Sequence, residues 1–462
     1  MAANSDNENL KREIGIRSLT LGIINGVVGT GIFVLPAIVA MSLGTAAIIA
    51  YLICGFLVFL IALCFAEVGS KISRSGGVYA YIETAFGTYA GFLANNLYWV
   101  GACVLAEAAL ANAFANTLKY FFPILDNEIS RISILIFVFG ILALLNIRSV
   151  KLGVRFMEIV TAAKIIPLII LVIAGIGFVS AKNLQWNSTP TMGNFGAASL
   201  LLFFAFMGME TPLSYSGEIK NTRRTIPISI ALGISCVLVL YISIQLITQG
   251  VLGLTISMHK DSPLGAVAGV IFGRVGIALI LITTAISMLG ILAGDLLAIP
   301  RILYAGARDG LLPGILAKVH PRFSTPYISV MTYSSLALVI AIFGGFRQLA
   351  ILASASTLLI YLGVVLATLK LRNQGSPEGG KSFRVPGGPI VPLLAICVII
   401  WLLTNLSKKE LTGIVIFLAV LSLIYLLRIW WRRKYKIRPK EPVIVPEFTL
   451  LQSAKSGHAR RS

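Results

Sequence analysis

Glycines and a threonine interrupt an apolar stretch near the beginning of the chain. The sequence NGVVGTGIFVLP places Gly29, Thr30 and Gly31 inside a run that is hydrophobic from residue 16 to residue 42. Each glycine weakens a helix by about 1 kcal/mol relative to alanine. A helix broken here exposes N–H groups, which attract a carboxylate, and C=O groups, which attract an ammonium group. A zwitterionic amino acid supplies both, and the Thr30 hydroxyl can add one hydrogen bond.

A second apolar stretch is interrupted in a similar way. It reads LLFFAFMGMETPLSYSGEIKN, with Gly208, Glu210 and Pro212 near its middle. A pair of interrupted segments at corresponding positions of two halves points to a binding site between them. The GxxxG spacing of Gly22 and Gly26 offers another explanation for the first stretch, namely close helix packing. The presence of two interrupted stretches favours a binding site over that explanation.

A lone lysine, Lys164, lies in the middle of the apolar stretch 154–180. A charge at mid-membrane costs about 2.5 kcal/mol or more, so an intramembrane lysine predicts a function. Burial favours the neutral amine, so Lys164 could carry a coupled proton, or it could act as a fixed cation. A snorkelling lysine is the alternative, which its central position disfavours.

Two carboxylates are expected near the cavity. Glu210 follows the second interruption and is a proton-sensitive gate, a partner for a cationic substrate, or a carboxylate bonded within the broken backbone. Asp295 either faces the substrate or pairs with a basic residue such as Arg301. Glu107 and Glu158 also lie within or near apolar segments, and the sequence assigns them no role.

Glu67 ends the second apolar segment, next to Lys71 and Arg74. These residues and Glu218 are expected to form the salt bridges of an inner gate. A solvated charge cluster at the membrane edge is the alternative.

The composition identifies the class of protein that must position these residues. Hydrophobic residues make up 57% of the 462 residues and charged residues 12%, whereas soluble domains average about 25% charged residues. The mean hydropathy is +0.91. We therefore expect an all-α integral membrane protein. The N-terminal sequence has no cleavable signal pattern, and the five cysteines lie in apolar runs without metal-ligand spacing, so neither a metal nor a cofactor is predicted.

Twelve apolar segments are long enough, or nearly so, to cross a membrane. The predicted segments are 16–42, 45–70, 86–120, 132–148, 154–180, 196–217, 226–250, 264–298, 327–344, 348–369, 388–406 and 411–431. An even number places both termini on one side. If that side is the cytoplasm, 29 of the 38 Lys and Arg residues are cytoplasmic, as the positive-inside rule requires. The net charge of +20 thus reflects orientation in a plasma membrane rather than binding to nucleic acid.

Five motifs in order resemble the amino acid–polyamine–organocation transporter superfamily. They are GVVGTGIFVLP, AEVGSKISRSGGVYAYIETAFG, FFAFMGMET, GEIKNTRRTIP and PRILYAGARDGLLP. The resemblance implies a LeuT-type fold with 5+5 inverted repeats and alternating access. The implied divisions are a cytoplasmic tail (1–15), two inverted repeats (16–180 and 181–370), two extra helices (371–431) and a basic tail (432–462) that could contact anionic lipid.

The resemblance also assigns the substrate contacts. Members of the superfamily bind the substrate carboxylate at the helix 1 break, here residues 29–31. They bind the α-amino group through carbonyls of helices 1 and 6, which here fall near Val27, Phe204, Ala205 and Met207.

Three further positions follow from the same resemblance. An aromatic residue of helix 6 covers the pocket, and Phe204 or Phe206 would serve. Many amino acid transporters of the superfamily carry a lysine at the position of Lys164, in contact with the unwound part of helix 1. Asp295 falls where some exchangers place a gating aromatic residue.

These observations predict a secondary active transporter of amino acids, working by proton symport or by exchange. The apolar residues Phe204, Phe206, Met207 and Met209 favour neutral amino acids. A cationic amino acid or polyamine is the alternative if Glu210 and Asp295 are both ionised. A non-transporting amino acid sensor on the same fold is a further alternative. An enzyme is not expected, because the three histidines lie in loops or in the tail.

Overall fold

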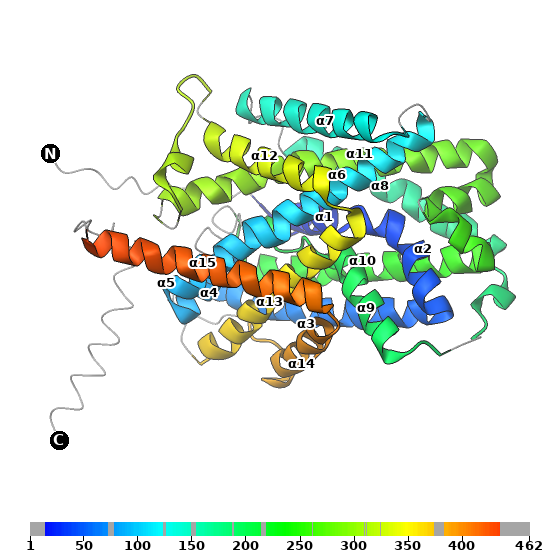
Figure 1. The fold of residues 1–462 in the computed structure, drawn as a ribbon. Coiled ribbons are helices and arrows are strands. Elements are labelled where there is room, and N and C mark those ends of the chain that lie inside the picture. The colour runs from blue at the N-terminus through cyan, green and yellow to red at the C-terminus, as the bar shows by residue number, and fades with distance from the viewer. Residues whose placement is uncertain are drawn as a thin grey trace.

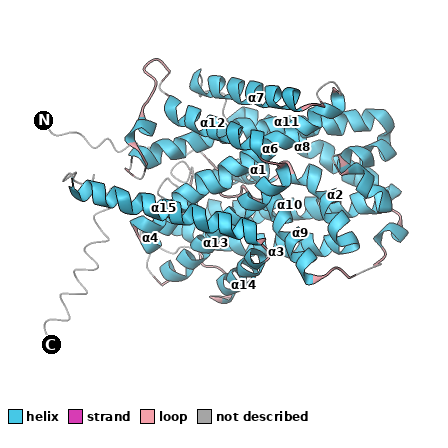
Figure 2. Ribbon diagram, viewed as in Figure 1, coloured by secondary structure: helices cyan, strands magenta, loops and turns pink. Residues whose placement is uncertain are grey.

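The computed structural model describes residues 14–72, 78–122, 126–148, 154–186, 189–213, 219–260, 262–308, 310, 312–323, 325–373 and 383–434. Almost all of these residues are helical, and no strand occurs among them apart from an isolated bridge between Ile14 and Ile219 (Figure 2). The expectation of an all-α membrane protein is confirmed. Most of the two predicted tails lies outside the described residues.

Each of the twelve predicted apolar segments corresponds to helical structure (Figure 1). The helices are α1 (Ile16–Val27), α2 (Gly31–Leu43), α3 (Ala47–Lys71), α4 (Val78–Phe86), α5 (Thr88–Asn96), α6 (Leu105–Phe121), α7 (Glu128–Arg148), α8 (Val154–Gly175), α9 (Met192–Phe203), α10 (Thr222–Leu252), α11 (Pro263–Arg308), α12 (Tyr327–Phe343), α13 (Phe346–Leu371), α14 (Ile390–Thr404) and α15 (Lys408–Lys434). A π-helical segment, Leu97–Val104, joins α5 to α6, and α11 is kinked at Gly273.

The first and sixth predicted segments are the two that break. We call the interruption of segment 16–42 the helix 1 break and the interruption of segment 196–217 the helix 6 break; the latter is unrelated to the label α6. Segment 16–42 consists of α1 and α2, separated by the non-helical residues 28–30. Segment 196–217 begins as α9, tightens into the 3₁₀ turn Phe204–Phe206 and then leaves the α-helix. The second half of this segment was expected to be helical, but the structure describes no α-helix between Met207 and Leu213.

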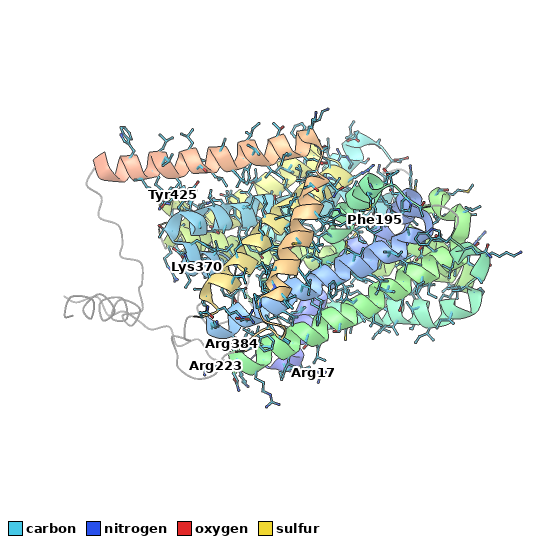
Figure 3. All side chains as sticks on the ribbon, turned by 90° about the horizontal axis from the view of Figure 1, so that it is seen from below. Arg17, Phe195, Arg223, Lys370, Arg384 and Tyr425 are labelled. Carbon is cyan, nitrogen blue, oxygen red and sulfur yellow. The ribbon has the colours of Figure 1, made fainter. Side chains whose placement is uncertain are left out.

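The exposed faces of the bundle are apolar, as a lipid environment requires. Eight helical stretches of the described chain are long and apolar enough to cross a membrane, and shorter apolar helices complete the set. Helix α7 lies along the upper edge of the bundle in Figure 1, and α15 lies along the upper edge in Figure 3, beside the labelled Tyr425; only 11% of the most apolar window of each is buried. The protein is therefore a multi-pass membrane protein.

Basic residues gather toward one end of the bundle. Arg17, Arg223, Lys370 and Arg384 lie toward that end, whereas Phe195 lies toward the other (Figure 3).

A polar network at the end of α12 holds three helices together. The side-chain amide of Asn112 on α6 donates to the carbonyls of Ala341 (3.0 Å) and Gly344 (2.9 Å). The Arg131 guanidinium on α7 donates to the Asn112 side-chain oxygen (2.7 Å) and to the carbonyl of Ile342 (2.9 Å). The network pairs the last carbonyls of α12, which have no partner within the helix.

Replacing Asn112 with alanine should destabilise the protein, because the Ala341 and Gly344 carbonyls lose the donors of a buried side chain. The expected loss is about 1–3 kcal/mol, seen as a lower melting temperature of the detergent-purified protein. Asn146→Ala is the matched control, since its amide bonds only the Leu142 carbonyl of its own helix (2.9 Å). Equal melting temperatures for the two variants would contradict this role of Asn112.

Candidate functional site

A cavity of about 480 Å³ lies between the two broken helices. Its walls come from α1, α2, α6, α8 and α11, from the π-helical segment Leu97–Val104 and from residues 204–212. Helical breaks and a cavity therefore occur together, as expected from the cost of unpaired backbone groups in hydrocarbon. The cavity extends to Ile14, Ser18 and Arg301, so it reaches toward the end of the bundle that carries Arg17.

The start of helix α2 faces this cavity without a side-chain cap. Helix α2 begins at Gly31, and Thr30 before it makes no side-chain cap. The Thr30 hydroxyl is 2% exposed and has no hydrogen-bond partner in the described part of the chain. Gly29, Thr30 and Gly31 all line the cavity, as does Val27. The start of a helix carries a partial positive charge and free N–H groups, so this wall suits an anion.

The glycines of this break are needed mainly for contact with the other broken helix. A Cβ atom at Gly31 would lie 2.6 Å from the Cα atom of Ala205, and one at Gly26 would lie 2.6 Å from the Gly208 carbonyl oxygen. Gly208 itself adopts φ +106°, a conformation that favours glycine. The sequence analysis placed Gly31 in the expected carboxylate site, and the structure gives contact with Ala205 as a separate reason for a glycine there. At Gly29 the added atom would meet only the flexible Ile291 side chain, at 2.8 Å.

The helix 6 break places only part of its predicted contact set on the cavity. Phe204 and Met207 line the cavity. Ala205 and Phe206 do not, although both were predicted to contact substrate. The Phe206 ring is fully buried against the rings of Tyr51 and Tyr241. Residues three apart in a 3₁₀ turn lie on the same face, so Phe204 and Met207 both reach the cavity, whereas the two residues between them point elsewhere.

A tyrosine on α10 joins the two breaks. The Tyr241 hydroxyl lies 2.8 Å from the Val27 carbonyl oxygen and 3.0 Å from the Ala205 carbonyl oxygen. Its single proton can be donated to either. Two of the carbonyls predicted to bind a substrate amino group are therefore already within reach of a protein donor. Val27 also accepts a hydrogen bond from the Gly29 N–H (2.8 Å).

Lys164 contacts the unwound backbone of helix 1, as the resemblance implies. Its ammonium group donates to the carbonyls of Asn25 and Val28, both at 2.7 Å. The side chain is fully buried and does not line the cavity. Snorkelling toward the membrane surface does not occur. Lys164 thus lies behind the break and binds it from the side of α8.

Glu210 is bonded within the helix 6 break. It accepts a hydrogen bond from the Gly208 N–H (3.2 Å) and another from the Tyr361 hydroxyl of α13. The residue lines the cavity but is only 4% exposed. Of the three roles predicted for Glu210, this geometry matches the third, in which the carboxylate accepts hydrogen bonds at the broken backbone.

Asp295 faces the cavity and has an unexpected neighbour. It lines the cavity from α11 and forms no salt bridge with a basic residue of the described chain, while Arg301 donates to the Leu297 carbonyl of its own helix. The Glu107 carboxyl on α6 lies within hydrogen-bonding reach of Asp295. Glu107, to which the sequence analysis gave no role, is fully buried.

Glu67 lies in a separate buried network. Its carboxylate is 3.7 Å from the Lys71 ammonium group and 3.5 Å from the Arg372 guanidinium, and it accepts a hydrogen bond from the Val385 N–H (2.9 Å). The network ties α3 to the end of α13, and Glu67 does not line the cavity. Of the predicted gate partners, Lys71 is present, whereas Arg74 and Glu218 lie outside the described residues.

Several residues at the site have no strong signal in the sequence. Tyr98 and Cys103 reach the cavity because the π-helical segment widens the turn that carries them, and such segments recur at functional sites. Tyr241 and Tyr361 are ordinary aromatic residues of apolar helices. Glu107 is different, because an acid inside an apolar segment is by itself a signal of function.

Comparisons with known proteins agree with this architecture. A family model described as amino acid permease matches residues 14–409. The methylthioribose transporter of Bacillus subtilis (strain 168) is 31% identical over 466 residues, covering 95% of this chain and 97% of the relative. The branched-chain amino acid permease of the same organism is 28% identical, covering 92% and 95%. Its serine/threonine exchanger is 29% identical, covering 85% and 90%.

These similar proteins are transporters and permeases rather than enzymes, in agreement with the sequence analysis. The family model covers the helices that form both breaks, the cavity and the surrounding bundle. The chain therefore belongs to the amino acid permease family.

Proposed function

We propose that this protein is a secondary active transporter that carries neutral amino acids across the plasma membrane by alternating access. The observation that carries the proposal is the uncapped start of α2 on the cavity wall, where the buried Thr30 hydroxyl lacks a partner in the described chain. A substrate carboxylate would accept hydrogen bonds from these N–H groups and from Thr30. Residues 16–180 and 181–370 would form the two inverted repeats that move.

The lining of the cavity supports a neutral substrate. Apolar side chains of Leu110, Phe204, Met207 and Ile291 form much of its wall. Glu210 is held by two hydrogen bonds and is not free to pair with a cationic side chain. Two of the similar proteins are named for neutral amino acids, branched-chain in one case and serine and threonine in the other.

Lys164 acts as a fixed cation in this proposal. Two carbonyls at 2.7 Å satisfy its ammonium group, and it does not face the cavity. Its charge stabilises the carbonyl side of the break, while the N–H side stays open for substrate. Transport would then draw energy from a proton gradient through another group, or from exchange.

The direction of the chain follows from its basic end. Arg17, Arg223, Lys370 and Arg384 lie toward one end of the bundle (Figure 3), which the positive-inside rule assigns to the cytoplasm. The cavity reaches the same end through Ser18 and Arg301. These features support an orientation with both termini cytoplasmic and a cavity that opens toward the cytoplasm.

Uptake by proteoliposomes tests the substrate class. Unlabelled leucine, serine or alanine should inhibit uptake of a labelled neutral amino acid more strongly than lysine or arginine, because most of the cavity wall is apolar. Stronger inhibition by lysine or arginine, lost in the Asp295→Asn variant, would instead show a transporter of cationic amino acids. Binding without uptake would show a sensor.

Thr30→Val tests the carboxylate site, since it removes the hydroxyl and keeps the shape of the side chain. The dissociation constant for the substrate should rise about tenfold, the equivalent of one lost hydrogen bond of about 1.4 kcal/mol. Isothermal titration calorimetry measures it. Thr283→Val is the matched control, because that buried hydroxyl bonds the Leu279 carbonyl of its own helix (2.8 Å). Unchanged affinity in Thr30→Val would place the carboxylate elsewhere.

A further inference from the structure

Two carboxyl groups from different helices meet beside the cavity. Glu107 lies on α6 and Asp295 on α11, and these two helices pack together with α12 in the upper half of Figure 1. The two carboxyls are close enough for a hydrogen bond between them. Asp295 lines the cavity, whereas Glu107 is fully buried behind it.

The surroundings of the two acids differ. Within the described chain, no backbone N–H or cationic side chain pairs with either oxygen of Glu107. The fully buried Tyr333 hydroxyl of α12 lies near Glu107 and has no hydrogen-bond partner among the described residues. The cation that acts on Asp295 is Lys164 of α8, and Glu210 is a further acid that acts on it. Tyr98 and Cys103 approach the pair from the π-helical segment.

Electrostatics allow only one of the two acids to be charged. Two carboxylates in contact in a low-dielectric site cannot both ionise. Glu107 has neither a cation nor a backbone donor to stabilise a negative charge. Asp295 has a cation nearby and opens to the cavity. Glu107 is therefore the acid that would keep its proton, and this proton would be the one available to hydrogen-bond Asp295.

We propose that Asp295 is the binding site for the proton that crosses the membrane with the substrate, and that Glu107 is the positioning residue that holds it. An O–H bond forms at Asp295 when the cavity is open to the outside, with the proton taken from water. The bond breaks when the cavity is open to the cytoplasm, and the proton returns to water there. This inference rests on the proposed transport function and supplies its energy source.

Proteoliposomes with an imposed pH gradient test the proposal. For one proton per substrate, an inward gradient of one pH unit should raise accumulation by up to about tenfold in the wild type. Asp295→Asn should abolish this response and keep exchange against internal substrate, because the amide imitates the protonated acid. Asp126→Asn is the matched control, since that exposed acid pairs with Lys119 away from the cavity.

Two variants of Glu107 separate a positioning role from a structural one. Glu107→Gln retains a hydrogen-bond donor and should keep the response to the gradient. Glu107→Leu removes the donor, so the charged form of Asp295 loses stabilisation and the pH profile of uptake should move toward higher pH. If Asp295→Asn is inactive even in exchange, the profile of Glu107→Leu decides, and an unchanged profile overturns the proposal.

The outcomes distinguish this inference from the function on which it rests. Two results would overturn the assignment of the proton site without affecting the transport function. One is wild-type uptake that does not change with the pH gradient, and the other is a gradient response that is retained in Asp295→Asn. Absence of wild-type uptake and exchange for every amino acid tested overturns the transport function itself. Loss of the response in Glu107→Gln with its retention in Asp295→Asn reverses the two roles and also overturns the proposal.

Discussion

Backbone groups that leave a helix inside a membrane need partners from the protein, since hydrocarbon offers none. In this permease the two sides of the helix 1 break are treated differently. Lys164 and Tyr241 reach the carbonyls of Asn25, Val27 and Val28. The N–H side at the start of α2 has no such cap. The break therefore turns an uncapped, positively polarised helix end toward the cavity, and the proposed binding of a substrate carboxylate rests on this asymmetry.

The three intramembrane acids near the cavity have different surroundings. The Glu210 carboxylate accepts hydrogen bonds from the Gly208 N–H and the Tyr361 hydroxyl, so it is part of the hydrogen bonding of the helix 6 break. Glu107 is sealed from the cavity, and Asp295 opens to it. A count of acidic residues in the sequence overstates the negative charge that a substrate meets, because hydrogen bonding and burial decide which acid can be charged.

The sequence predicted the features that depend on local composition. Long apolar runs specify helices, and clustered glycines specify where two of them break, so both breaks and the cavity between them could be anticipated. The lysine behind the break could be anticipated too, because an isolated charge in an apolar segment is costly.

Features that depend on a distant partner could not be predicted in this way. The Phe206 ring points away from the cavity, toward the rings of Tyr51 and Tyr241. It lies two residues after Phe204 and therefore on a different face of the turn, and residue type alone does not give that direction. Gly31 owes its small size partly to Ala205, a residue far along the chain. The pairing of Glu107 with Asp295 required the packing of α6 against α11, although each acid alone was visible in its apolar segment.

The contact between Gly26 and Gly208 has a consequence for the evolution of new substrates. A side chain at either position would collide with the backbone of the other broken helix, so neither site can vary without a compensating change in its partner. Variation in specificity must come from positions whose side chains point into open space, such as Leu110, Met207 and Ile291. Substitutions at these three positions would change the cavity while the crossing point of the two broken segments keeps its pair of glycines.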